Sequence, residues 1–319
     1  MTEAALQPRL KEVSALGPGG FRKLAYAEWG SELASRTVIC VHGVSRSGRD
    51  FDLLAAELAK SGARVIAPDL PGRGRSEWLP SPTHYSDQTY VGAMAALIAR
   101  LDVHEVDWIG TSLGGHIGML LAAEEGSPIR RLVLNDFGAR VSAAALRRIG
   151  GYLTRSWVFK SKDALESHLR DALAPFGELT EEQWHHLATH SAVEDPDGTY
   201  RFHYDPAIGA RFAIPIWLDV VLWQVWERIE CPVLILRGEH SDLLSAHTVE
   251  MMCKRGAAAK AGRVSAVEIE DCGHAPALMD AAQIGLIQGF LFRDDEASGA
   301  SASRSRARGQ GRATEASPS

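Results

Sequence analysis

The sequence predicts an α/β fold, in which helices flank a doubly wound, mostly parallel sheet and a helical cap is inserted. Short apolar runs such as 37–41 and 231–236 have the length and composition of parallel strands that are buried on both faces. Helical patterns alternate with these runs, as the crossovers of a parallel sheet require. Roughly ninety residues separate the strand that ends near Asp136 from the one that starts near Cys231, far more than one crossover needs.

This pattern divides the chain into four parts. Residues 1–19 are expected to form a loosely attached N-terminal arm, which runs into a Gly-Pro-Gly-Gly segment. Residues 20–138 and 230–293 are expected to form the α/β core. Residues 139–229 are expected to form the cap, with helices at 143–154, 162–174, 181–191 and 218–229. Residues 294–319 contain almost nothing apolar to bury and are expected to be a disordered tail.

The core strands are expected in a regular order along the chain. The run 37–41 ends at His42 and Gly43, and the run 64–67 precedes a turn, 68–76, that contains Asp69. The run 106–109 leads into Gly-Thr-Ser-Leu-Gly-Gly at 110–115, and a helix-like run follows at 116–123. The later runs end close to polar residues: 132–134 is followed by Asp136, and 264–270 is followed by His274.

Ser112 is the expected nucleophile. It lies on a sharp strand-to-helix turn, which exposes its hydroxyl and strains its backbone. Such a turn needs small residues two positions on either side, because side chains there would collide with the neighbouring strand and helix. Gly110 and Gly114 occupy these positions. The helix that follows points its N-terminus at the site and favours negative charge that develops there.

A base and an acid are expected downstream, because a serine hydroxyl is a poor nucleophile at neutral pH until a base removes its proton. His274 is the expected base. Asp242, on the loop after the run 231–236, is the favoured acid, which would hold the imidazole in the productive tautomer. Asp136 also ends a buried strand and remains the alternative acid. These groups should converge, because the carboxyl ends of parallel strands meet at one edge of the sheet.

Two backbone N–H groups are expected to stabilise the oxyanion of the reaction. Leu113, directly after the nucleophile, supplies one. Val44 is the expected second donor, since the glycine before it lets the loop turn its amide toward Ser112. His42 is interpreted as the residue that shapes this loop. Arg46 either reaches into the pocket or braces the loop through a carboxylate, and both interpretations stay open.

Taken together, these motifs resemble those of serine hydrolases of the α/β-hydrolase superfamily. The resemblance rests on Val-His-Gly at 41–43, Pro-Asp-Leu-Pro-Gly-Arg-Gly-Arg-Ser at 68–76, the turn around Ser112, and Asp242 with Gly273-His274, and it covers about residues 20–293. It implies an α/β-hydrolase fold and a cofactor-free activity. Because the nucleophile is Ser rather than Asp, it argues against the haloalkane dehalogenase and epoxide hydrolase branches. The resemblance is closest to intracellular bacterial carboxylesterases, some of which act on hydroxyalkanoate oligomers or synthetic polyesters.

The resemblance implies hydrolysis of carboxylic esters with small or medium acyl groups through an acyl-enzyme on Ser112. A second interpretation keeps the same triad but cleaves a carbon–carbon bond in a ring-fission product. Enzymes of that kind usually add polar pocket groups for the carboxylates of the substrate, and Arg46 is the one candidate here. A third interpretation is a non-catalytic ligand receptor on the same fold. Fold analogy does not supply the substrate.

Five of the eight tryptophans fall within the predicted cap. Packing of the cap helices accounts for most of them, but Trp157 and Trp223 are candidates, together with Arg46, for contacts with the substrate. His186 and His190 lie four residues apart on one predicted helix, next to His185. Neither the glutamate of a zinc-protease motif nor a third ligand is apparent, so no metal site is expected.

Composition limits the classes of partner. The formal net charge of −6 and the isoelectric point of about 6.1 offer no basic face for nucleic acid or anionic lipid. No apolar stretch reaches the length of a membrane span, and the first residues lack the apolar core of a signal peptide. Cys40 and Cys231 lie in buried-strand patterns rather than in a disulfide framework. We therefore expect a cytoplasmic protein that binds a small-molecule ester, neither nucleic acid nor membrane; its oligomeric state stays open.

Overall fold

The computed structural model describes residues 7–213 and 215–293, so the expected disordered tail, 294–319, lies outside the described residues. Eight strands form one sheet: β1 (Arg9–Gly17), β2 (Gly20–Trp29), β3 (Thr37–Val41), β4 (Arg64–Pro68), β5 (Val106–Thr111), β6 (Ile129–Asn135), β11 (Val233–Gly238) and β12 (Val264–Ile269). Their order across the sheet is β1-β2-β4-β3-β5-β6-β11-β12. Pairing is parallel from β4 to β12 and antiparallel where β2 meets β1 and β4. This confirms the predicted α/β fold with a mostly parallel sheet.

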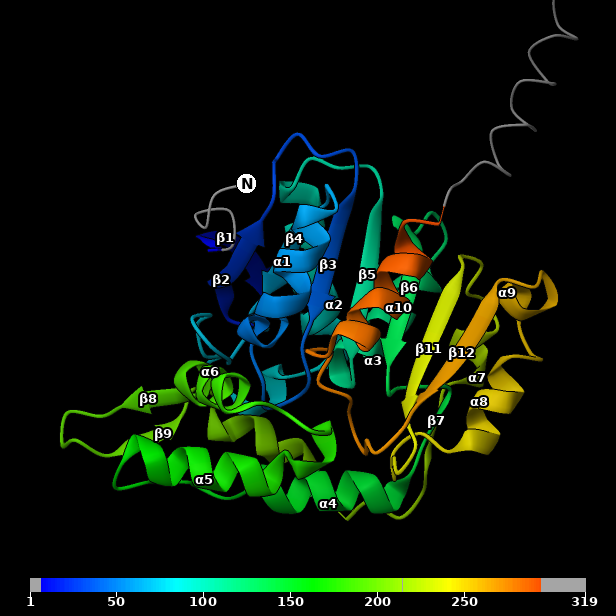
Figure 1. The fold of residues 1–319 in the computed structure, drawn as a ribbon. Coiled ribbons are helices and arrows are strands. Elements are labelled where there is room, and N and C mark those ends of the chain that lie inside the picture. Colours follow the sequence, from blue (N-terminus) through cyan, green and yellow to red (C-terminus); the bar gives the residue numbers. More distant parts are fainter. Residues whose placement is uncertain (1–6, 214, 294–319) are drawn as a thin grey trace, which may run out of the picture.

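Helices cover both faces of this sheet (Figure 1). Successive side chains of β3 point to opposite faces, as the pleat dictates. Val38 and Cys40 pack in one apolar cluster with α1 (Asp52–Lys60) and α10 (Ala281–Leu291). Ile39 and Val41 pack in a second cluster with α2 (Asp87–Arg100) and α3 (Leu113–Ala122). Two short helices, α8 (Ala246–Met252) and α9 (Ala257–Lys260), lie between β11 and β12 in the chain.

The N-terminal segment corrects one expectation. Residues 9–17 are not a loose arm, because β1 pairs with β2 along its whole length, from Arg9 opposite Glu28 to Gly17 opposite Gly20. The glycines that suggested a linker form a tight hairpin turn instead, with a φ of 84° at Gly19. Arg9 also donates to the buried Glu28 carboxylate at 2.9 Å, which fixes the strand at the edge of the sheet.

The segment between β6 and β11 forms the predicted cap. Its helices are α4 (Ala143–Leu153), α5 (Lys162–Ala172), α6 (Glu181–Ser191) and the short α7 (Trp223–Trp226), and its strands are β7 (Arg140–Val141), β8 (Ala192–Glu194), β9 (Tyr200–Phe202) and β10 (Val220–Val221). Side-chain oxygens of Ser142, Ser161 and Thr180 accept backbone N–H groups at the starts of the first three helices. Figure 1 shows α4 and α5 beyond the carboxyl-terminal edge of the parallel strands, with α6 between α5 and α1 in this view.

Three of the four predicted cap helices are present, and the fourth is wrong. Residues 218–229 contain the strand β10, which pairs with β7, and the four-residue α7. The backbone N–H of Leu222 donates to the carbonyl of Ala139, and the indole of Trp226 donates to the carbonyl of Arg255. These contacts with other parts of the chain override the helical pattern of the segment.

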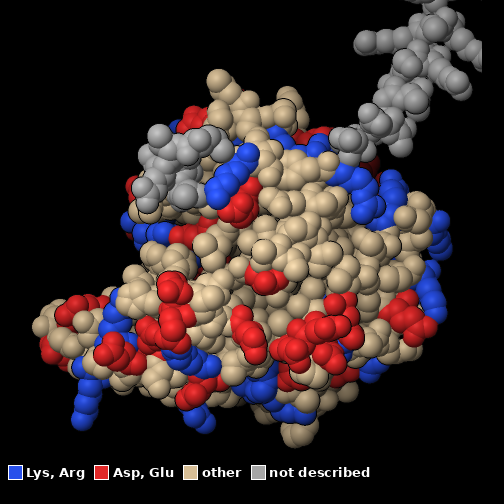
Figure 2. Space-filling view, in the orientation of Figure 1, with Lys and Arg blue, Asp and Glu red and all other residues tan. Residues whose placement is uncertain are grey.

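Figure 2 shows how charged side chains are distributed over one face of the molecule. Figure 2 shows Lys and Arg interspersed with Asp and Glu, with no continuous basic patch on the face in view. No helix in the described ranges, 7–213 and 215–293, combines the length and the apolar content that crossing a bilayer requires. The four cysteines are free thiols.

Candidate active site

Ser112 lies at the junction of β5 and α3 with a φ of 51° and a ψ of −112°. Positive φ is rare and strained for a residue other than glycine and persists only where the surroundings enforce it. A Cβ atom at Gly114 would lie 1.9 Å from the carbonyl oxygen of Val41, and one at Gly110 would lie 2.3 Å from the backbone of Gly114. The turn therefore has the geometry that the sequence predicts, and glycine is required on both sides of the serine.

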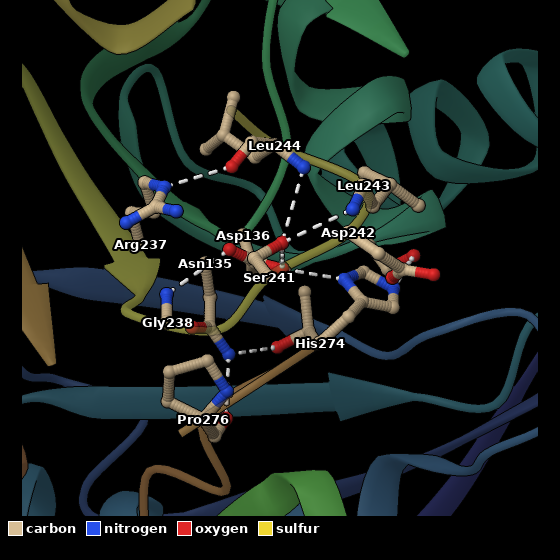
Figure 3. A network of polar contacts seen from close by, with 12 residues as sticks. Asn135, Asp136, Arg237, Gly238, Ser241, Asp242, Leu243, Leu244, His274 and Pro276 are labelled. Carbon is tan, nitrogen blue, oxygen red and sulfur yellow. Dashed lines mark hydrogen bonds and ion pairs between the residues drawn. The ribbon is translucent and has the colours of Figure 1, made fainter. Parts of the chain in front are cut away.

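His274 connects Ser112 to a buried carboxylate. It lies on the loop between β12 and α10, and its Nε2 atom is 2.9 Å from Ser112 Oγ. Its Nδ1 atom is 2.6 Å from Oδ2 of Asp136 (Figure 3). The chain of contacts from Ser112 through His274 to Asp136 matches the arrangement of a nucleophile, a base and an orienting acid.

The preference for Asp242 as the hydrogen-bond partner of His274 is wrong in this structure. The side chain of Asp242 is 47% exposed and forms a bidentate ion pair with Arg148 of α4, at 2.7 and 2.8 Å. The alternative weighed from the sequence, Asp136, takes its place. Hydrogen bonding to Arg148 lowers the pKa of the Asp242 carboxyl.

The loop after β11 explains why Asp136, rather than Asp242, is the partner of His274 (Figure 3). The hydroxyl of Ser241 donates to Oδ2 of Asp136 at 2.6 Å, and the N–H of Gly238 donates to Oδ1 at 3.1 Å. The N–H groups of Leu243 and Leu244 in turn donate to the Ser241 hydroxyl. The loop thus supplies donors to the acid of the neighbouring strand. No sequence signal separates the two candidate acids, because β6 and β11 are adjacent and end at the same edge.

Asn135 ties the loops of the site together. Its Nδ2 atom donates to Thr111 Oγ1 at 3.0 Å and to the carbonyl of Pro276 at 2.9 Å. Thr111 precedes Ser112 and Pro276 lies two residues after His274, so one buried amide links the segments that carry Ser112 and His274. Sequence reasoning did not single out this residue, since only the tertiary structure brings its partners together.

Val44 and Leu113 border the same cavity as Ser112, and their role as oxyanion donors stays a prediction. The loop that carries Val44 is held from two sides. The carbonyl of Val44 accepts a hydrogen bond from Arg73 Nε at 2.9 Å. His42 accepts the N–H of Leu70 through Nε2 at 2.9 Å, and its Nδ1 contacts the carbonyl of Gly43 at 2.7 Å. Burial keeps the pKa of His42 well below its ordinary value, so the ring is neutral and shapes the loop.

Two chambers meet at Ser112. The larger, about 290 Å³, is bordered mainly by apolar side chains of the core and cap, including Phe137, Leu146 and Ile208. The smaller, about 190 Å³, is bordered by Tyr152, Phe176, His274 and others. Val44, Ser112 and Ile149 border both. Ser112 therefore borders a cavity on two sides.

Of the three expected substrate contacts, Arg46 borders a chamber, whereas Trp157 and Trp223 do not. Arg46 braces its loop, with 2.7 Å hydrogen bonds from Nε and Nη2 to Asp50, and it also borders the smaller chamber. Trp157 and Trp223 border neither chamber. Trp157 stacks on Phe159 within the cap, and Trp223 lies under the guanidinium of Arg255 at 4.4 Å. Both rings serve packing rather than the site.

His186 and His190 lie closer to a third metal ligand than the sequence suggested. Their ring nitrogens and an oxygen of Asp52 lie within 4.8 Å of one another. The guanidinium of Arg49 donates to both oxygens of Asp52, and the backbone carbonyl of Arg49 lies 3.0 Å from His186 Nε2. A cation here would have to displace this arginine, and His185 is not part of the group.

Comparisons with known proteins agree with this fold. A family model described as the alpha/beta hydrolase family matches residues 38–284. The 3-hydroxybutyrate-oligomer hydrolase of Cupriavidus necator is 43% identical over 291 residues, which cover 89% of this chain and 97% of that protein. An alpha/beta hydrolase from Novosphingobium aromaticivorans has a similar structure, with a TM-score of 0.79 and 31% identity over 90% of this chain and 99% of that one. The chain belongs to the alpha/beta hydrolase family and is a hydrolase.

Proposed function

We propose that this protein cleaves carboxylic esters through an acyl-enzyme on Ser112, with His274 as the base and Asp136 as the orienting acid. The observation that carries the proposal is the continuous set of contacts from Ser112 Oγ to His274 Nε2 and from His274 Nδ1 to Asp136 Oδ2, at 2.9 and 2.6 Å. The position of Ser112 at the strained turn between β5 and α3 also supports its role as the nucleophile.

Each group has one task in the reaction. His274 accepts the proton of Ser112 as Oγ attacks the ester carbonyl, and Asp136 holds the ring with its Nδ1–H turned away from the serine. The N–H groups of Val44 and Leu113 stabilise the oxyanion, each worth roughly 3 kcal/mol. His274 then protonates the departing alkoxide and later activates the water that releases the acid.

The two chambers support an assignment of the two halves of an ester. His274 borders the smaller chamber and is absent from the residues that border the larger one. Because this residue must protonate the leaving oxygen, the alcohol half belongs in the smaller chamber and the acyl half in the larger. An ester with a chain on both sides of the scissile bond fits this arrangement. Similarity to a 3-hydroxybutyrate-oligomer hydrolase supports short oligomers of hydroxy acids as the substrate class.

A substrate panel tests this function. The wild-type protein and Ser112→Ala would be assayed with 3-hydroxybutyrate dimer and trimer, p-nitrophenyl butyrate and a ring-fission dienone. We expect the wild type to hydrolyse the oligomers and the p-nitrophenyl ester, and the variant to lose at least about 10³-fold in kcat. Faster turnover of the dienone than of any ester would favour the carbon–carbon hydrolase instead. Folded wild-type protein that turns over nothing would favour a receptor.

A further inference from the structure

Arg73 is a buried guanidinium with an unused donor. It lies on the loop between β4 and α2 and is 0% exposed. Its Nε donates to the carbonyl of Val44 at 2.9 Å, and its Nη1 donates to the carbonyl of Pro71 at 2.8 Å and the hydroxyl of Tyr90 at 2.7 Å. Its Nη2 has no hydrogen-bond partner among the described residues. A buried N–H of a charged group without a partner is unfavourable, so a missing acceptor is expected.

The other three arginines that border the two chambers each form an ion pair with a carboxylate. Arg46 pairs with Asp50, Arg148 with Asp242, and Arg211 with Asp87. No carboxylate in the described part of the chain forms an ion pair with Arg73. Its cation instead lies over the rings of Tyr85 and Tyr90, at 5.9 and 5.0 Å from their centroids. Among these four arginines, Arg73 alone has a buried guanidinium nitrogen without a hydrogen-bond partner.

The position of Arg73 restricts which part of a substrate it can reach. The residue borders the larger chamber, which takes the acyl half. Its hydrogen bond to the carbonyl of Val44 holds it against the loop of the expected oxyanion donor. With the ester carbonyl at the expected oxyanion donors, acyl atoms within a few bonds of that carbonyl are expected to lie near Arg73. In a 3-hydroxybutyryl group, the oxygen on the third carbon is such an atom, and it is an acceptor whether it is a free hydroxyl or an ester oxygen.

We propose that Nη2 of Arg73 donates to the oxygen on the third carbon of the acyl group, so that Arg73 selects 3-hydroxyacyl esters over plain acyl esters. The inference rests on the proposed function and deepens it. In a hydroxy-acid oligomer the free carboxylate lies in the alcohol half, so it belongs in the smaller chamber and is not the partner of Arg73. A plain acyl group leaves the buried donor unpaired, and sites built around such a donor discriminate against the ligand that lacks the acceptor.

Three esters with one leaving group test the inference. These are p-nitrophenyl 3-hydroxybutyrate, p-nitrophenyl butyrate and p-nitrophenyl 3-methylbutanoate, in which a methyl group replaces the hydroxyl at nearly the same size. We expect the wild type to prefer the hydroxy ester by at least about tenfold in kcat/KM over both others. We expect Arg73→Met to reduce this preference to within about threefold. The preference is the readout, because losing the bond to Val44 slows all three esters alike.

Arg211→Met is the matched control, since it removes an arginine from the same chamber whose partner is already Asp87. This variant should keep the wild-type preference. Equal kcat/KM values for the three esters with the wild type would overturn the inference even if Arg73→Met does not fold. An unchanged preference in a folded Arg73→Met would overturn it as well. Failure to hydrolyse any ester would instead remove the proposed function on which it rests.

Discussion

Replacing Asp136 by asparagine is the most informative perturbation of the site. Three donors converge on its carboxylate: His274 at Oδ2, Ser241 at Oδ2 and Gly238 at Oδ1. A carboxylate accepts at both oxygens, whereas an amide accepts at one and donates at the other. If the oxygen of the asparagine stays with Gly238, its NH₂ group faces His274 and favours the tautomer with the proton on Nε2. That nitrogen then cannot accept the proton of Ser112.

The expected loss is large because the wrong tautomer removes the base. A change of this kind at the acid of a Ser-His-Asp triad lowers kcat by about 10⁴-fold. If the oxygen faces His274 instead, the amide NH₂ opposes the N–H of Gly238, and the free energy of unfolding should fall by roughly 1–3 kcal/mol. We therefore expect Asp136→Asn to lose activity, lose stability, or both, but not to leave both unchanged.

Asp242→Asn is the matched control. Its carboxylate is 47% exposed and contacts Arg148 of the cap, an exposed ion pair worth at most about 1 kcal/mol. This variant should stay within about fivefold of the wild type. The assay is kcat/KM for p-nitrophenyl butyrate, with thermal unfolding measured on both variants. The reasoning is refuted if Asp242→Asn loses more than about 10³-fold while Asp136→Asn stays within tenfold and folds normally.

Two further predictions concern stability. Gly114→Ala should lower the free energy of unfolding by about 3 kcal/mol or more, because its Cβ would lie 1.9 Å from a backbone oxygen. Gly92→Ala is the control and should not lower it, since Gly92 lies in α2 with no atom within 4 Å of the added Cβ. Urea unfolding that ranks the two variants the other way would contradict this prediction. Burial lowers the pKa of His190 and His203 to about 3, so between pH 6.5 and 3 the unfolded chain binds protons that the folded protein does not, and the free energy of unfolding should fall as the pH drops through this range. Urea unfolding at pH 7, 6 and 5 checks this, and stability that rises toward pH 5 is the contrary result.

The sequence was most informative where neighbours along the chain determine the geometry. The turn around Ser112 is such a case, because Gly110 and Gly114 are required by atoms only a few residues away or on the adjoining strand. The choice of acid is different. Asp136 and Asp242 end adjacent strands at one edge, and the donors that select between them come from the folded loop after β11. Such a choice depends on packing that the pattern of residues does not contain.

The other differences between the predictions and the structure also arise from contacts between distant parts of the chain. Gly17 and its neighbours suggested a linker, but glycines serve a hairpin turn equally well, and only the pairing of β1 with β2 decides between the two. The apolar run 218–229 suggested a helix, but its pairing with β7 and the anchoring of Trp226 shorten it to one turn. Trp157, which is partly buried, packs on Phe159 and His168 of the cap, and only the folded cap brings these rings together.

Labelling with a fluorophosphonate, followed by intact-mass and peptide analysis, tests the central claim most directly. The claim is that His274, held by Asp136, activates the hydroxyl of Ser112. We predict one label per chain, located on Ser112, and labelling slowed by at least about 10³-fold in His274→Ala. A label on another residue, or an equal labelling rate in folded His274→Ala, would contradict the account.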